Sequence, residues 1–303
     1  MYLKRAKQST DPRLRSLLQK ATRRGFSEVV TRAFARLELN GDKVWLRSRT
    51  VVITFEECWP LAASLAINSD SHTKLKALLA VTKATKYKDA AGLGALAFAY
   101  QEGDRSMLDC VPNYDLLKLV SGGLQRPAAF FQWLNGQTKS EQSDRVIRSA
   151  QKYLPAATWQ WDKACIIAGA VLSIYSDVPE AQPSEESFGD FPYWVALDKH
   201  TPQGKVALKE VATSLKTSYR QLIWASFYYE SAYSNSLVPS IWWEAEKVWR
   251  LRKAGLTPES AEALWAEASI LIHNRLENEA DLLRKVVSNS LSGSKTQDEL
   301  FKS

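Results

Sequence analysis

The sequence has 303 residues and contains no G-x-x-x-x-G-K-[ST] motif, so nucleotide hydrolysis of the P-loop type is excluded. Cysteine is also scarce. The three cysteines, Cys58, Cys110 and Cys165, lie far apart and form no C-x-x-C pair and no Cys/His cluster. We therefore expect buried, reduced thiols rather than a disulfide framework or a zinc site, and we expect no metal and no other cofactor.

Long apolar runs are missing as well. The longest one, residues 164–175, is shorter than the ~20 residues that a membrane-spanning helix needs. Residues 1–15 are polar and basic and lack the apolar core of a signal peptide. We expect a soluble, cytoplasmic protein without a membrane partner.

Basic residues are in excess. Forty Lys and Arg residues stand against 33 Asp and Glu residues, which gives a formal net charge of +7. Such a balance favours an anionic partner, and nucleic acid is the commonest one. A solubilising surface is the alternative explanation for part of this charge.

The apolar periodicity is helical almost throughout and predicts an all-α fold, a multi-helix globular bundle. Asp-Pro at residues 11–12 and Thr-Pro at 201–202 and 257–258 each place a capping residue before an N1 proline. Residues 44–59 are apolar on most faces and predict a central buried helix, although the Val-Val-Ile triplet at 51–53 also suits a short strand.

The breaker-rich stretch 176–192 is the best candidate for a loop or a domain boundary. We divide the chain into a helical region at 1–135, variable helices and a loop at 136–192, a C-terminal helical region at 193–287 and a flexible tail at 288–303. One compact domain overall is the alternative.

Two early segments resemble a known family: SLLQKATRRG at residues 16–25 and WLRSRTVVITFEECWPLA at residues 45–62. They are similar to the C-terminal, collar-like helical region of the RarA/MgsA/WRNIP1 clamp-loader-like ATPases, where such a stretch follows the ATPase core. Glu56 and Glu57 occupy the place of that family's Glu-Asp pair, while Trp59 stands where the family usually has Gly. The resemblance implies a helical scaffold that handles DNA and forms a homo-oligomer.

The segment PYWVALDKHTPQGK at 192–205 places Asp198 and His200 directly before a helix start. The free amides of a helix N-terminus suit a phosphate, and a carboxylate with an imidazole beside it suits acid–base chemistry. The simpler interpretation is that Asp198 supports the helix dipole and that His200 is an exposed or capping residue. A similar D-x-H-T-x-x-G stretch occurs in some relatives of the same ATPase family.

Glu57 ends a buried apolar helix, where a carboxylate is costly unless it is paired. We favour a structural partner such as Arg47 or Arg49 over a working acid with a raised pKa. Lys83, Lys86 and Lys88 lie close together in the sequence. They suit phosphate contacts, or an amine nucleophile at Lys86 or Lys88, or simply a solvated basic face.

From these patterns we assign two sets of candidate residues. The candidate catalytic residues are Glu57, Lys86, Asp198 and His200. The candidate DNA-binding residues are Arg23, Arg24, Arg47, Arg49, Lys83, Lys88, Tyr193 and Trp194, with Tyr193 or Trp194 as a stacking wall for an extruded base.

The sequence therefore predicts a DNA-acting helical protein. The best enzymatic hypothesis is a metal-independent DNA glycosylase-type hydrolase that excises a flipped, modified or unmodified base in DNA repair or phage defence. The alternative is a non-catalytic collar module that binds DNA and oligomerises in a replication or recombination complex. A weaker third hypothesis is an inhibitor that imitates such a module.

Overall fold

A computed structural model describes residues 11–66, 70–185, 187 and 189–288, which form thirteen α-helices and no β-strand. The predicted all-α fold is confirmed, while the tail at 289–303 lies outside the described residues. The α-helices are α1 (Pro12–Arg23), α2 (Ser27–Leu39), α3 (Lys43–Cys58), α4 (Ser71–Thr82), α5 (Asp89–Gln101), α6 (Tyr114–Gln125), α7 (Pro127–Asn135), α8 (Glu141–Tyr153), α9 (Gln160–Tyr175), α10 (Pro202–Ser214), α11 (Tyr219–Ser226), α12 (Ile241–Lys253) and α13 (Pro258–Ser288). Four short helices are η1 (Trp59–Ser64), η2 (Leu154–Ala156), η3 (Tyr193–Ala196) and the π-helix η4 (Phe227–Ser231).

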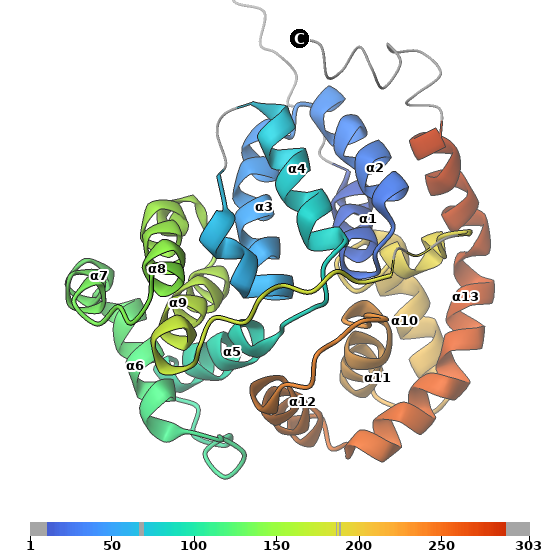
Figure 1. The fold of residues 1–303 in the computed structure, drawn as a ribbon. Coiled ribbons are helices and arrows are strands. Elements are labelled where there is room, and N and C mark those ends of the chain that lie inside the picture. Colours follow the sequence, from blue (N-terminus) through green and yellow to red (C-terminus); the bar gives the residue numbers. More distant parts are fainter. Residues whose placement is uncertain (1–10, 67–69, 186, 188, 289–303) are drawn as a thin grey trace, which may run out of the picture.

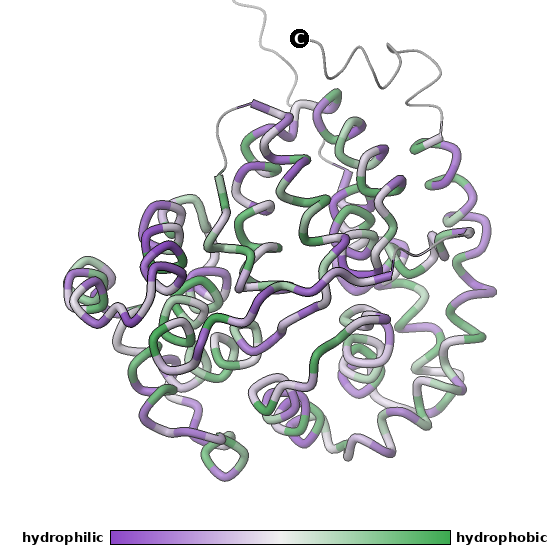
Figure 2. The backbone as a smooth tube through the Cα atoms, viewed as in Figure 1, coloured by the Kyte–Doolittle hydropathy of each residue, from purple (hydrophilic) through white to green (hydrophobic). Residues whose placement is uncertain are grey.

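Most of the helices form three groups, and the buried helix α5 lies between these groups (Figure 1). Helices α1 to α4 pack together, α6 and α8 pack with α9, and α10 and α11 pack on the long helix α13. Helix α5 joins the groups because it contacts α9, α12 and α3. Both α5 and α9 are apolar on nearly all faces, as helices enclosed by other helices must be, and Figure 2 shows them as largely hydrophobic.

Glycines allow the helices around α5 to approach one another closely. A Cβ atom on Gly92 would lie 2.5 Å from the backbone carbon of Trp242 in α12, and one on Gly94 would lie 2.7 Å from the Cα of Cys165 in α9. No side chain fits at either distance, so these two positions set how closely α12 and α9 approach α5.

Extended segments cross between the groups. Residues 83–88 form isolated β-bridges with Cys58, Pro183 and Leu237. The long connection at 176–192 runs across the molecule beside them (Figure 1). The expected loop at 176–192 is thus found, without helix or strand in its described residues. Backbone hydrogen bonds join this loop to residues 83–85 and to Gly25.

The predicted helix starts are found where the capping chemistry placed them. Asp11 accepts a hydrogen bond from the Arg13 amide, and Thr201 accepts one from the Gly204 amide. The Val-Val-Ile triplet is helical, because it lies inside α3 with all three side chains buried. The described cysteines are free, but Cys110 is only half-buried, unlike Cys58 and Cys165.

The glycine at position 92 provides a stability test. Replacing Gly92 with Ala should lower the free energy of unfolding by about 2 kcal/mol, because the new methyl group overlaps the α12 backbone. Gly122 is the matched control: it is a helical, exposed glycine whose Cβ would meet no atom within 4 Å. Replacing Gly122 with Ala should raise the free energy of unfolding by roughly 0.5–1 kcal/mol. Urea unfolding of both variants measures the two changes, and equal changes would show that contact with α12 does not require glycine at position 92.

Candidate functional site: a buried ion-pair network and an accessible cation–tryptophan cluster

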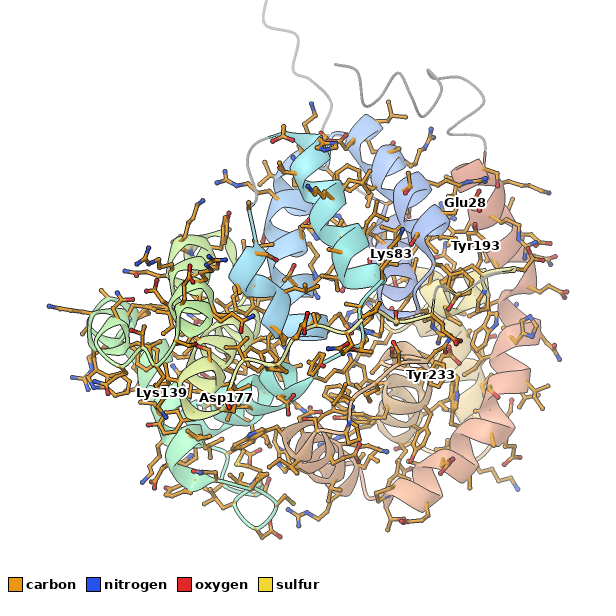
Figure 3. All side chains as sticks on the ribbon, viewed as in Figure 1. Glu28, Lys83, Lys139, Asp177, Tyr193 and Tyr233 are labelled. Atoms are coloured by element: carbon orange, nitrogen blue, oxygen red, sulfur yellow. The ribbon has the colours of Figure 1, made fainter. Side chains whose placement is uncertain are left out.

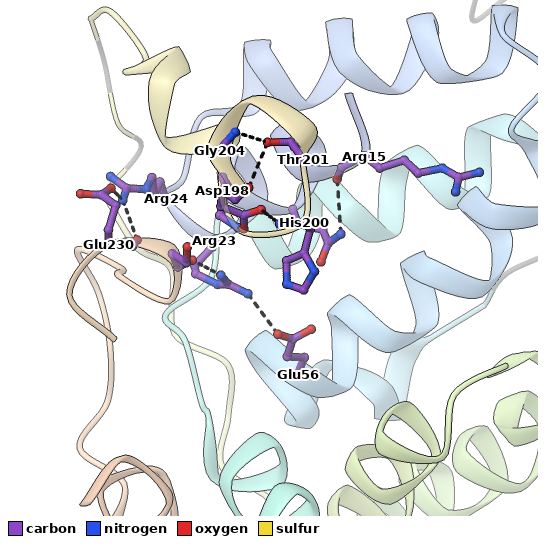
Figure 4. Close-up of polar contacts among 12 residues, drawn as sticks. Arg15, Arg23, Arg24, Glu56, Asp198, His200, Thr201, Gly204 and Glu230 are labelled. Atoms are coloured by element: carbon purple, nitrogen blue, oxygen red, sulfur yellow. Dashed lines mark hydrogen bonds and ion pairs between the residues drawn. The ribbon is translucent and has the colours of Figure 1, made fainter. Parts of the chain in front are cut away.

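Helix α1 carries three basic side chains into the protein interior. Lys20 and Arg23 lie in its last turn and Arg24 is its C-cap residue, and the helix dipole favours cations at this end. The side chains of Lys20 and Arg23 are almost completely buried, and that of Arg24 is largely so. Buried cations need partners, and each of these three has at least one carboxylate (Figure 4).

Glu57 at the end of α3 is held by two of the buried cations. Its Oε1 accepts a hydrogen bond from Arg23 Nε at 2.6 Å, and its Oε2 lies 3.0 Å from Lys88 Nζ. Burial opposes ionisation, but Arg23 and Lys88 outweigh it and lower the pKa of Glu57 to about 2. The structural pairing expected for Glu57 is therefore present, with Arg23 and Lys88 as partners in place of Arg47 or Arg49.

The Asp198 carboxylate also has a hydrogen-bond donor at each of its oxygens. Its Oδ2 accepts from Lys20 Nζ at 2.5 Å, and its Oδ1 accepts from the backbone amide of His200 at 2.8 Å. Although desolvation is the largest single influence, Lys20 and His200 leave its pKa lowered. The following helix start fits tightly here, because a Cβ atom on Gly204 would lie 2.1 Å from the Asp198 carbonyl oxygen.

Arg49 extends the network towards α9. It donates to Gln19 Oε1 at 2.8 Å, to Glu56 Oε2 at 3.1 Å and to Asp162 Oδ1 at 3.1 Å. Glu56 in turn accepts from Arg23 through its other oxygen. A continuous chain of charges thus links α1, α3 and the start of α9.

The π-helix η4 supplies the remaining partners of α1. Arg24 pairs with the Glu230 carboxylate, and Arg23 donates to the Ser231 carbonyl oxygen. A π-turn leaves carbonyl groups without the usual intrahelical donor, so its end is suited to accept from a buried guanidinium. The α1 cations therefore fasten the C-terminal helices to the N-terminal ones.

The remaining candidate residues lie in different surroundings. Lys86 is buried, and its Nζ donates to the carbonyl oxygens of Val81, Thr82 and Ala84. Arg47 and Lys83 are exposed. Figure 3 shows Lys83 and Tyr193 on separate segments.

The expected stacking wall lies against α13. Tyr193 is buried, with the guanidinium of Arg284 over its ring. Trp194 is half-buried and stacks on Trp265 and His273 of α13. Both rings are therefore already engaged with side chains of α13.

Glu57 and Asp198 are thus brought together through α1, but in the interior. The cavity next to Asp198 has a volume of about 10 Å³, room for no more than one water molecule. Lys86 makes a separate set of contacts with backbone carbonyl groups, and His200 is exposed. The two carboxylates have both oxygens engaged and act as structural counter-ions in this conformation.

A second cluster is accessible, and its four members are Trp161, Lys199, Trp224 and Arg250. We call it the cation–tryptophan cluster, and all four side chains are half-buried. The Cζ of Arg250 lies 4.7 Å from the Trp161 ring centroid and 4.9 Å from that of Trp224. The Nζ of Lys199 lies 4.3 Å from the same Trp224 ring.

Ionisable groups around this cluster have shifted pKa values. Burial lowers the pKa of Lys199 to about 8 and lowers that of the His200 imidazole, although His200 is exposed. Burial, helped by Glu56 and opposed by Arg49, raises the pKa of Asp162. Asp162 is buried, whereas Lys199 and His200 are at least partly accessible, and shifted pKa values in such accessible groups are typical of functional sites.

One oxygen of Asp162 is unengaged. Arg49 donates to Oδ1, but among the residues that the structure describes no donor contacts Oδ2. This differs from Glu56, Glu57 and Asp198, whose two oxygens all have partners. Asp162 follows Trp161 in α9, but its carboxylate contacts Arg49 of the buried network and not a member of the cation–tryptophan cluster.

Two larger pockets lie elsewhere. One of about 340 Å³ is lined mainly by apolar side chains of η1 and α4, and one of about 310 Å³ lies between α6 and the start of α9. Within the described part of the chain, no three His, Cys, Asp or Glu side chains gather as metal ligands would. No described helix combines the length and apolar character needed to cross a bilayer.

Comparison with known proteins gives no match: no family model, no curated protein and no solved structure is significantly similar to this chain.

The sequence analysis missed the cation–tryptophan cluster altogether. Its members come from α9, the loop before α10, α11 and α12, and no local spacing joins them. A weak signal was available, since Lys199 lies between the two candidate residues Asp198 and His200. Lys20 and Glu230 were missed too, because a charged residue in an amphipathic helix usually faces solvent.

The Glu57 pairing predicts a specific pH dependence. The pKa of Glu57 is about 2 in the folded protein against 4.5 ordinarily, so the unfolded chain binds more protons between these values. Its contribution to stability is therefore complete above about pH 5 and falls, by up to about 3 kcal/mol, as the pH drops towards 2. Replacing Glu57 with Gln should cost about 3–5 kcal/mol at pH 7, because Arg23 and Lys88 lose a buried counter-ion.

Urea unfolding across pH 2.5–7 tests this, and the difference between wild type and Glu57→Gln should shrink as the pH falls. Glu102→Gln, on an exposed carboxylate, is the control and should change stability little at any pH. A constant difference across the range would show that Glu57 does not carry the expected linkage.

Proposed function

We propose that the protein binds single-stranded or locally unpaired DNA at the cation–tryptophan cluster. The observation that carries this proposal is the placement of the Arg250 guanidinium over both Trp161 and Trp224, with Lys199 over Trp224 as well. Two indole rings and two cations therefore share one accessible patch.

This pattern matches what an unpaired strand requires. Indole rings stack on exposed bases and cations neutralise phosphates, which together give affinity without strict sequence preference. Arg250 is already oriented by a 2.9 Å bond from its Nε to Glu246, so its other nitrogens can contact a phosphate. The net charge of +7 supports an anionic partner.

DNA binding is tested with a fluorescent oligothymidine and anisotropy. We expect Trp161→Ala and Trp224→Ala each to weaken binding roughly 5- to 100-fold, the loss of one stacked base. Trp133→Ala is the matched control, because Trp133 is exposed on α7 and contacts neither cluster tryptophan. Affinity should fall steeply with salt.

Equal affinity in all three variants, with unchanged melting temperatures, would refute the assigned surface. A clear preference for RNA of the same sequence over DNA would refute the assigned partner.

We also propose a second candidate function, base excision, because one carboxylate of the ion-pair network keeps an oxygen unengaged. Excision requires a carboxylate that stabilises the oxocarbenium-like sugar and positions water. Among Glu56, Glu57, Asp162 and Asp198, Asp162 is the one that keeps an oxygen unengaged, and its pKa is raised. It is better suited than Glu57 or Asp198, whose oxygens are all engaged.

Base excision predicts abasic sites in oligonucleotides that carry modified bases, without added ATP or metal. Asp162→Asn should lower the rate at least 100-fold, while Asp144→Asn, at a carboxylate of α8 that pairs with Arg148, should leave it unchanged. The measurement is strand cleavage at the new abasic site by hot alkali. Undiminished cleavage with Asp162→Asn would exclude this carboxylate as the catalytic group.

A further inference from the structure

We propose that the amine of Lys199 is a nucleophile that forms an imine with the aldehyde of an abasic deoxyribose in DNA. The inference rests on the proposed DNA binding at the cation–tryptophan cluster and names a substrate class for that same site. It assigns Lys199 a role that is separate from phosphate binding.

The position of Lys199 differs from that of the buried lysines. Lys20 and Lys88 are paired with carboxylates, and Lys86 is held by three carbonyl oxygens. In the described parts of the chain, Lys199 forms neither an ion pair nor a hydrogen bond. Its Nζ instead lies 4.3 Å from the Trp224 ring centroid and 4.6 Å from that of Phe227. Its nitrogen is therefore not committed to an oxygen acceptor.

The groups that face Lys199 come from three elements. Asp198 in its own loop and Glu246 of α12 favour the ammonium form, whereas Lys20 of α1 and Arg250 of α12 disfavour it. Lys20 already occupies the Asp198 carboxylate, and Arg250 and the Tyr228 hydroxyl occupy that of Glu246. With burial as the largest influence, the pKa of Lys199 falls to about 8, so much of the amine is neutral slightly above neutral pH.

The reaction balances with the groups present. The neutral amine adds to the C1′ aldehyde carbon of the ring-opened sugar and forms a C–N bond, giving a carbinolamine. Loss of the former carbonyl oxygen as water, which takes up both protons of the amine, leaves the C=N double bond. No oxidant, reductant or metal takes part.

An abasic site also fits the surroundings of Lys199. Its sugar lacks a base, so its aldehyde carbon can approach a side chain without displacing a stacked ring. Arg250 lies over both Trp161 and Trp224, so a move of its guanidinium to a flanking phosphate would free ring surface for the bases beside the gap. Lys199 contacts the same Trp224 ring as Arg250. A strand bound at this ring would therefore place its abasic sugar near Lys199.

The experiment is reductive trapping. The full chain is incubated with an oligonucleotide that contains one abasic site, in the presence of sodium cyanoborohydride. This reagent reduces an imine to a stable secondary amine. We expect a covalent protein–DNA adduct on a denaturing gel, and we expect peptide mass spectrometry to place it on Lys199.

Lys199→Arg keeps the positive charge but removes the nucleophile, so it should lower the adduct yield at least tenfold. Its melting temperature should stay close to wild type, and the yields are compared at oligonucleotide concentrations that saturate both proteins, so that a change in affinity does not alter them. Lys205→Arg, on an exposed lysine of α10, is the control and should leave the yield unchanged. The trapping rate should rise with pH to a half-maximum near pH 8, as the Lys199 amine loses its proton.

The outcomes separate the two proposals. Binding of the intact oligonucleotide without an adduct, or an adduct of equal yield with Lys199→Arg, overturns the Lys199 inference alone. Absence of binding to either oligonucleotide overturns the proposed function and, with it, this substrate. An adduct mapped to Lys199 that is lost in Lys199→Arg supports both.

Discussion

The structure depends on neutralising the basic end of α1 inside the protein. Lys20, Arg23 and Arg24 are largely removed from water, and a cation in that position is tolerated only beside an anion. The anions come from three distant places: α3, the loop before α10 and the π-helix. The stability of the N-terminal helix in this position therefore depends on contacts from the C-terminal half.

This coupling separates the interior charges from the accessible ones. Glu57 and Asp198 are fully occupied as counter-ions, so the residues that look most like catalytic groups in the sequence hold the scaffold together. Among the described residues, Lys199 Nζ and the Oδ2 atom of Asp162 have no ion-pair or hydrogen-bond partner. Lys199 lies over the Trp224 ring, and the Asp162 carboxylate is held by Arg49. A fixed network of this kind keeps both groups in place, which is how a rigid scaffold prepares a binding surface.

Much of the fold was readable from local chemistry. The helical period, the Asp-Pro and Thr-Pro starts and the breaker-rich 176–192 connection follow from backbone rules that act within a few residues. The pairing of Glu57 was also foreseeable, because a buried carboxylate needs a partner. Its partners were not, because Arg23 and Lys88 reach it from other elements.

The sequence by itself determined an all-helical chain with a basic balance, and it marked residues 16–25, 45–62 and 198–204 as unusual. Only the tertiary structure decided which charges face inward and which tryptophans share a cation. The helical period of a sequence shows which face of a helix is apolar and which is polar. It does not show which other helix that apolar face packs against. The packing of α5 against α9 and α12, with close glycine contacts, positions the helices that carry Trp161 and Arg250, while α11 and the loop before α10 supply Trp224 and Lys199.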